Sequence, residues 1–197
     1  MNKDTARILV IGAGVNGSLC AVGLHNAGMN VTVLARGKHY EDLRDTGIII
    51  EDPFKNTRTV TKVPVINRLD PQEVCDYILV IVRKNQVPDL LPVLAENRSP
   101  NVVFMLNNPS GPEEMTQALG RERVMLGFVF GAGRREGSVI HAIAGAGSSM
   151  GSTPFGELVS PRTSKSFSRT MYDGKACVHF LSNRPFRESS RPIRLFT

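Results

Sequence analysis

Short apolar segments rich in β-branched residues alternate along the chain with segments that carry apolar residues at helical spacing. Tyr77–Val82 is apolar throughout, as expected of a parallel strand that is covered on both faces. Leu90, Leu91 and Leu94 share one face of a helix predicted over Val87–Asn97. The other expected strands are 7–11, 30–35, 48–50, 57–66, 102–106 and 124–130, and the other expected helical segments follow residue 17 and cover 39–45, 71–73 and 112–119.

Alternation of strands and helices predicts an α/β fold built on a doubly wound, mostly parallel sheet. Val139–Ile143 and Phe155–Leu158 lie near glycine-rich turns and are expected to add antiparallel strands. In such sheets ligands bind beyond the carboxyl ends of the parallel strands. Those ends are expected to carry residues 12–17, 36, 83–86, 107–111 and 131–135.

The first of these ends has the pattern Gly-x-Gly-x-x-Gly, with a strand before it and a helical segment after it. Gly12 allows the tight turn, Gly14 lets a pyrophosphate approach the backbone, and Gly17 lets the helix pack on the sheet. The pattern predicts a Rossmann-type dinucleotide site, and an ordinary glycine turn is the alternative. The expected cofactor contacts are Gly12, Ala13, Gly14, Val15, Asn16 and Gly17.

The end of the second strand bears on which dinucleotide is bound. NAD enzymes place an Asp or Glu there to bind the ribose 2′-hydroxyl. This chain has Arg36, then Gly37 and Lys38, and its next carboxylate is Glu41. A guanidinium pairs with a 2′-phosphate through charge-assisted hydrogen bonds, so the sequence favours NADP. The alternative is that Arg36 is a solvated loop cation.

Charge divides the chain into two parts. Residues 1–159 hold 16 Lys and Arg against 16 Asp and Glu, whereas residues 160–197 hold 8 against 2. The net charge of +6 therefore belongs to the tail, and nothing in the first part favours nucleic acid. We expect a dinucleotide-binding domain over 1–159 and a basic, poorly ordered or aberrant tail rich in Ser, Arg and Pro over 160–197.

The cysteines and histidines give no sign of a metal site. Cys20, Cys75 and Cys177 are far apart in the sequence, which indicates reduced thiols. Neither His25 nor His39 has a Cys or a carboxylate at the spacing that is typical of metal ligands. The first expected strand begins within a few residues of Met1, so we expect no signal peptide. No apolar run approaches the ~20 residues that span a bilayer. We expect a cytoplasmic protein that binds neither a membrane nor a metal.

Several motifs together resemble the N-terminal domain of ketopantoate reductases (2-dehydropantoate 2-reductases), which reduce ketopantoate with NADPH in pantothenate synthesis. The resemblance covers about residues 7–158. Its most specific part is Gly131–His141, which is similar to the family's Ala-Arg-Arg-Asp/Glu-Gly-x-Val-Ile-x-His stretch. The other matching segments are 11–17, 34–37, 80–87 and 106–114.

The resemblance implies roles for residues beyond the glycine loop, which we define as residues 12–17. Arg83 stands where the family has a Lys beside the nicotinamide, and Gly133 is expected to border the cofactor. Asn107 stands where a family Asn contacts both the nicotinamide ribose and the substrate, with a helix or turn cap as its alternative role. Asn108-Pro109 replaces the family's glycine, so this turn must differ locally.

In the family, the proton donor is a Lys in an all-helical C-terminal domain, which residues 160–197 do not resemble. Lys175 weakly matches that Lys, and a solvated tail lysine is the alternative. Arg134-Arg135 is expected to form a solvated turn. The catalytic residues are therefore left unknown, and this chain alone is expected to bind NADPH with little or no reduction of a 2-keto acid. Uncovered apolar surface would favour homo-oligomers. The alternatives are a non-catalytic NADPH-binding module and a protein that binds an acidic partner through its tail.

Overall fold

A computed structural model describes residues 6–129, 131–142 and, as backbone, 155–157. The tail and Lys175 lie outside these residues, as do the predicted strand ends at 130, 143 and 158. Four α-helices and one 3-10 turn are described: α1 (Val15–Asn26), α2 (Gly37–Thr46), η1 (Lys84–Gln86), α3 (Val87–Glu96) and α4 (Glu113–Leu119).

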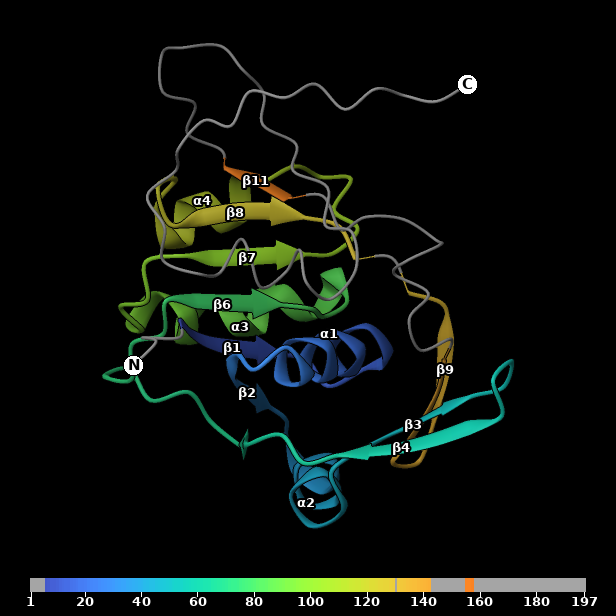
Figure 1. The fold of residues 1–197 in the computed structure, drawn as a ribbon. Coiled ribbons are helices and arrows are strands. Elements are labelled where there is room, and N and C mark those ends of the chain that lie inside the picture. The colour runs from blue at the N-terminus through green and yellow to red at the C-terminus, as the bar shows by residue number, and fades with distance from the viewer. Residues whose placement is uncertain (1–5, 130, 143–154, 158–197) are drawn as a thin grey trace, which may run out of the picture.

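The larger sheet has seven strands in the order β11-β8-β7-β6-β1-β2-β5, and all except β11 run parallel (Figure 1). This topology confirms the predicted α/β fold. The edge strand β11 is antiparallel to its neighbour, as expected for residues 155–158. Its strands are β1 (Arg7–Ile11), β2 (Asn30–Leu34), β5 (Val65–Ile66), β6 (Tyr77–Val80), β7 (Val102–Met105), β8 (Val124–Gly127) and β11 (Phe155–Glu157).

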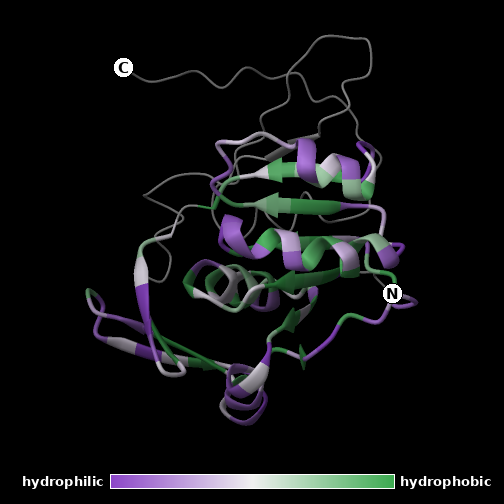
Figure 2. Ribbon diagram, turned by 180° about the vertical axis from the view of Figure 1, so that it is seen from behind, coloured by the Kyte–Doolittle hydropathy of each residue, from purple (hydrophilic) through white to green (hydrophobic). Residues whose placement is uncertain are grey.

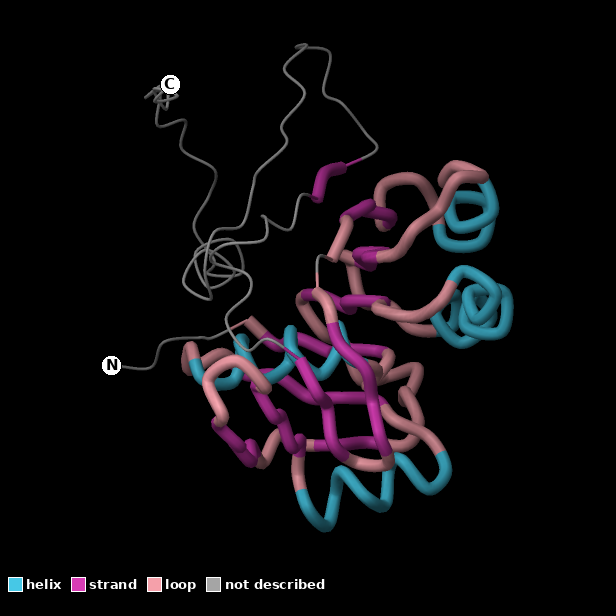
Figure 3. The backbone as a smooth tube through the Cα atoms, turned by 90° about the vertical axis from the view of Figure 1, so that its right-hand side faces the viewer, coloured by secondary structure: helices cyan, strands magenta, loops and turns pink. Residues whose placement is uncertain are grey.

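Helices cover both faces of the larger sheet, as the edge-on view in Figure 3 shows. On one face, Ile8 and Val10 pack against Ala21 and Leu24 of α1. On the other face, side chains such as Phe104 pack against α3 and α4. Because both faces are covered, the central strands are apolar almost throughout, which Figure 2 shows by colour.

A smaller sheet lies on the α1 side, with strands in the order β4-β3-β10-β9. Ile48, Ile50 and Ile140 of this sheet are buried in the same core cluster as α1. The fold therefore contains a second sheet that the sequence did not separate from the first. Its strands are β3 (Ile48–Asp52), β4 (Thr57–Thr61), β9 (Gly133–Glu136) and β10 (Val139–Ala142).

Three local predictions are wrong. The single strand expected over 57–66 is two strands in different sheets, because Pro64 has no N–H to continue a ladder. The helical turn expected at 71–73 is a single hydrogen-bonded turn, in which Glu73 N–H donates to the carbonyl oxygen of Asp70 at 3.1 Å and Gln72 N–H donates to Asp70 Oδ1 at 2.9 Å.

The solvated turn expected at Arg134-Arg135 is part of strand β9, which Gly137 (φ +58°) turns back into β10. Arg134 forms an ion pair with Glu136 at 3.1 Å on the surface of this sheet. His141 of β10 lies between two carboxylates, 3.2 Å from Glu136 and 3.3 Å from Glu51. The predicted addition at 139–143 runs antiparallel to β9 as expected, but it also runs parallel to β3.

Candidate dinucleotide site

The carboxyl ends of β1, β2, β6 and β7 meet at one edge of the larger sheet. In the strand register, Ile11 lies opposite both Leu34 and Val80, and Val80 lies opposite Phe104. The segments that follow these residues carry the glycine loop, Arg36, Arg83 and Asn107. The structure therefore brings the predicted site residues of four strands to one edge, as the rule for doubly wound sheets requires.

Two glycines of the glycine loop are required by the fold itself. Gly12 has a φ of +106°, and a Cβ there would lie 2.3 Å from the carbonyl oxygen of Ile81. A Cβ on Gly17 would lie 1.7 Å from the carbonyl oxygen of Gly12. These two residues let β1, the loop and α1 pack without space between them, as predicted for the turn and the helix contact.

Gly14 is different, because a Cβ there would meet nothing within 4 Å. Its backbone is extended (φ −76°, ψ −168°), and it is the N-cap of α1 with no side-chain cap bond. The first turn of α1 contains no acidic residue. The N–H groups of Val15, Asn16 and Gly17 have no acceptor within the helix. Open space therefore faces a positive helix end, the arrangement that binds phosphate groups.

Two side chains hold the glycine loop in place through the backbone of Ala13. Its carbonyl oxygen accepts hydrogen bonds from Ser18 Oγ at 3.3 Å and from His39 Nε2 at 2.7 Å. Because His39 donates from Nε2, the neutral ring has its proton on that nitrogen. His39 lies in the first turn of α2, so the start of α2 holds the glycine loop in place. No local pattern predicts this role of His39, because the contact joins residues 26 positions apart.

Asn16 lies on the side of the loop that faces β8 and β9. Its Oδ1 is buried and has no hydrogen-bond partner among the described residues. A Cβ on Gly131 would lie 2.1 Å from that oxygen, and a Cβ on Gly133 would lie 3.0 Å from Val15 Cγ1. The segment that holds Gly131 and Gly133 therefore packs directly on the first turn of α1. A buried amide oxygen without a donor beside the helix start is a polar group available to a ligand.

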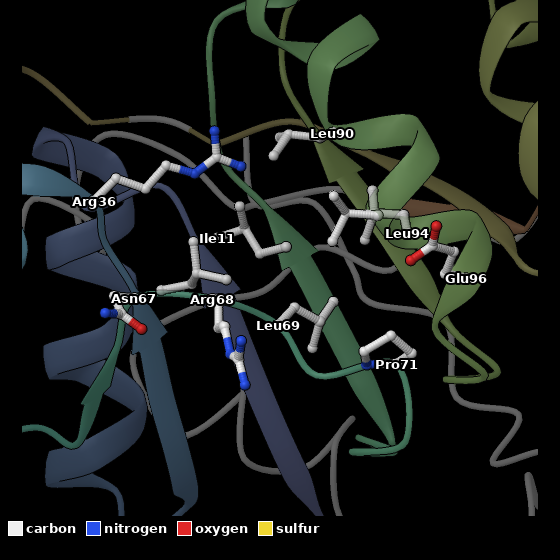
Figure 4. Close-up of a pocket in the computed structure, with 11 residues that line it drawn as sticks. Ile11, Arg36, Asn67, Arg68, Leu69, Pro71, Leu90, Leu94 and Glu96 are labelled. Atoms are coloured by element: carbon white, nitrogen blue, oxygen red, sulfur yellow. The ribbon is translucent and has the colours of Figure 1, made fainter.

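A cavity of about 230 Å³ lies beside Arg36, between the ends of β1 and β2 and helix α3. Its floor includes Ile11 and Leu34, and Leu90 and Leu94 form the wall on the α3 side (Figure 4). Arg36 is exposed and is the N-cap of α2, and its guanidinium extends over Ile11 toward Leu90. The floor and the α3 wall of the cavity are therefore apolar, and Arg36, Asn67, Arg68 and Glu96 are its polar lining residues.

Arg83 and Asn107 are exposed and follow the neighbouring strands β6 and β7. Arg83 lies three residues beyond Val80, and Asn107 lies three residues beyond Phe104. Val80 and Phe104 are opposite each other in the strand register. Next to Arg83, Lys84 forms an ion pair with Glu114 of α4. The turn after β7 is closed by Asn108, whose Nδ2 donates to the carbonyl oxygen of Gly111. Asn108 thus takes the turn-capping role considered for Asn107, and Asn107 is left at the surface of the site.

The two described cysteines stay protonated at neutral pH. Burial raises the pKa of Cys20 to about 12 and also raises the pKa of Cys75. Within the part of the chain that the structure describes, no three His, Cys, Asp or Glu side chains gather as metal ligands. Among these same residues, no helix is both long and apolar enough to cross a bilayer.

The model of the ketopantoate reductase family (PanE/ApbA) matches residues 8–158. The chain belongs to the ketopantoate reductase family. A 2-dehydropantoate 2-reductase of Pyrococcus horikoshii is 30% identical over 117 residues, which are 58% of this chain and 36% of that protein. The resemblance inferred from the motifs is thereby confirmed.

Solved structures show the same fold. The 2-dehydropantoate 2-reductase of Geobacter metallireducens has a TM-score of 0.65 at 20% identity, covering 80% of this chain and 51% of that one. A D-mandelate dehydrogenase solved with NADH and anilino(oxo)acetate has a TM-score of 0.61 at 17% identity, covering 69% and 45%. The chain thus spans about half the length of these ketopantoate reductase relatives, or less.

Proposed function

We propose that the carboxyl edge of the larger sheet binds NADP(H) and that the protein is an oxidoreductase that reduces a 2-keto acid such as 2-dehydropantoate. The observation that carries this proposal is the open space in front of Gly14 at the start of α1. This open space lies between the cavity beside Arg36 and the carboxyl ends of β6 and β7. A dinucleotide has the same order of parts, with a pyrophosphate between adenosine and nicotinamide.

The residues present fit each part of the cofactor. The N–H groups at the start of α1 would hold the pyrophosphate, and Arg36 would hold the 2′-phosphate. The apolar cavity under Arg36 would take the adenine. The buried Oδ1 of Asn16 has no donor among the described residues, and the nicotinamide carboxamide offers one.

NADPH, when bound, supplies the hydride for the reduction. Arg83 and Asn107 lie at the ends of β6 and β7, across the glycine loop from Arg36, on the side that we propose receives the nicotinamide. There, Arg83 would offer a cation to the carboxylate of a 2-keto acid, and the Asn107 amide would orient the substrate. Family membership and the membership of 2-dehydropantoate 2-reductases in that family support this class of substrate.

A second candidate is cofactor binding without turnover. Arg83 replaces a Lys of the family motif, and Asn108-Pro109 replaces a glycine, so the substrate side of the site differs from the family pattern. Oxidation of NADPH in the presence of ketopantoate distinguishes the two candidates. A protein that binds NADPH tightly and leaves it unoxidised supports the second.

Fluorescence titration with NADPH and NADH tests the cofactor assignment. The chain contains no Trp, so the reduced nicotinamide can be followed without tryptophan emission. We expect the chain to bind NADPH at least about tenfold more tightly than NADH, because Arg36 pairs with the 2′-phosphate. Arg36→Ala is expected to remove most of that difference. Equal affinities of the unaltered chain for the two cofactors would contradict the NADP assignment.

A further inference from the structure

Arg68 occupies the same position on β5 that Arg36 occupies on β2. The two strands are parallel neighbours, with Leu34 opposite Ile66, and the ladder continues where Ala35 N–H donates to the carbonyl oxygen of Ile66 at 3.0 Å. Arg36 and Arg68 each follow the paired residue by two positions. Because neighbouring strands lie about 4.8 Å apart, both side chains start close to one point of the carboxyl edge.

Both arginines line the cavity of about 230 Å³ that is placed to receive adenine. Both are exposed, and neither guanidinium forms an ion pair with a carboxylate of the described residues. In Figure 4 both side chains start on the strand side of the cavity, with the guanidinium of Arg36 on the side of Ile11 that faces Leu90 and the guanidinium of Arg68 on the other side. Glu96, the acidic residue among the lining, lies on the opposite wall.

The charged residues that follow Arg68 and Arg36 in the sequence interact with other groups. Asp70, two residues after Arg68, turns its carboxylate to the backbone and accepts from Gln72 N–H at 2.9 Å. Lys38, two residues after Arg36, lies 3.8 Å from Asp42 on its own helix. Two exposed cations thus line one cavity and form no ion pair with the described residues. A dianion bound at this edge can draw both long side chains toward it.

We propose that Arg68 is a second determinant of cofactor specificity, which holds the 2′-phosphate of NADP(H) together with Arg36. This inference rests on the proposed function and goes beyond the single arginine that the motif predicts. A phosphate monoester presents three acceptor oxygens, enough for two guanidinium groups. NADH has a hydroxyl at the same place, so Arg68 should contribute little to NADH binding.

The test measures dissociation constants of NADPH and NADH for the unaltered chain, Arg68→Ala, Arg36→Ala and the double variant. We expect Arg68→Ala to weaken NADPH about tenfold and NADH less than about twofold, since charge-assisted hydrogen bonds to the phosphate are lost. The two single effects should not add, because both residues bind one group. Arg58→Ala, which removes an arginine of β4 outside the cavity lining, is the matched control and should change neither constant.

The outcomes separate this inference from the proposed function. If the unaltered chain binds neither cofactor, both fail. If the unaltered chain prefers NADPH and Arg68→Ala keeps the full preference, only the role of Arg68 is overturned. If Arg68→Ala weakens both cofactors equally, Arg68 contacts a part that they share, such as adenine, and the inference is also overturned. Circular dichroism and thermal unfolding of each variant show whether the fold is kept.

Discussion

Gly14 and Gly17 lie three residues apart in the same loop, and the structure gives their side-chain positions opposite consequences. A methyl at Gly14 meets open space, whereas a methyl at Gly17 would lie 1.7 Å from the carbonyl oxygen of Gly12. Gly14→Ala should therefore fold normally and lose the cofactor. Gly17→Ala should disturb the fold itself, because the atom it meets is backbone on a turn that has no room to move.

The magnitudes follow from these contacts. As an N-cap, Ala is less favourable than Gly, so Gly14→Ala should cost about 1 kcal/mol of unfolding free energy. Its methyl would occupy the place of the pyrophosphate and break about two charge-assisted hydrogen bonds, worth about 3 kcal/mol or more, which weakens NADPH about 100-fold. Overpacking commonly costs about 1–3 kcal/mol, and Gly17→Ala should reach about 3 kcal/mol.

Thermal unfolding and NADPH titration of the two variants separate the effects. A loss of 3 kcal/mol corresponds to a fall in Tm of roughly 6–12 °C for a domain of this size. Gly23→Ala is the matched control, since Gly23 lies within α1 and its Cβ would also meet nothing within 4 Å. It should stabilise the helix by roughly 0.5–1 kcal/mol and leave NADPH binding unchanged. Unchanged NADPH affinity in Gly14→Ala would refute the assignment of the open space to a pyrophosphate.

Three further predictions concern stability and reactivity. Asn97→Ala should lower the unfolding free energy by roughly 2–4 kcal/mol in a denaturant titration, because the buried side chain bonds to Asp70 O, Glu73 O and Ser99 N at 2.9–3.0 Å. A loss below about 1 kcal/mol would show that water replaces these bonds. Asn108→Ala should cost about 1 kcal/mol through the open turn, whereas Asn107→Ala should leave stability within about 0.5 kcal/mol and raise the dissociation constant of NADPH. Cys20 is half-buried and should react with iodoacetamide at pH 8 more slowly in the folded chain than in the unfolded chain, and equal rates would contradict the raised pKa of its thiol. Because burial raises its pKa from 9.0 to about 12, the unfolded thiol ionises first, so unfolding free energy should fall between pH 9 and 12.

The sequence was sufficient for the parts of the site that depend on local chemistry. The strand ends expected at residues 12–17, 36, 83–86 and 107–111 lie at one carboxyl edge, because parallel strands in one sheet end at the same edge. Glycine positions could be predicted as well, since Gly12 and Gly17 are needed by the turn and the helix contact of any such loop.

Contacts between distant segments could not be predicted. Arg123 donates to the carbonyl oxygens of Leu94, Asn97 and Ser99, where α3 ends, and these bonds join residues 24 to 29 positions apart. The bond from His39 to Ala13 is of the same kind. The position of Arg68 level with Arg36 could not be predicted either, because it depends on β5 adding to β2, and the pattern merged β5 with β4 into one strand. A two-residue strand is too short for periodicity to detect.

In the proposed complex, a phosphorylated dinucleotide lies across the carboxyl edge, with its pyrophosphate at the start of α1. A crystal structure of the chain grown with NADPH tests this most directly. We expect pyrophosphate oxygens within about 3 Å of the N–H groups that follow Gly14, and the 2′-phosphate at the guanidinium of Arg36. Density for the cofactor elsewhere, or protein side chains filling the space in front of Gly14, would contradict it.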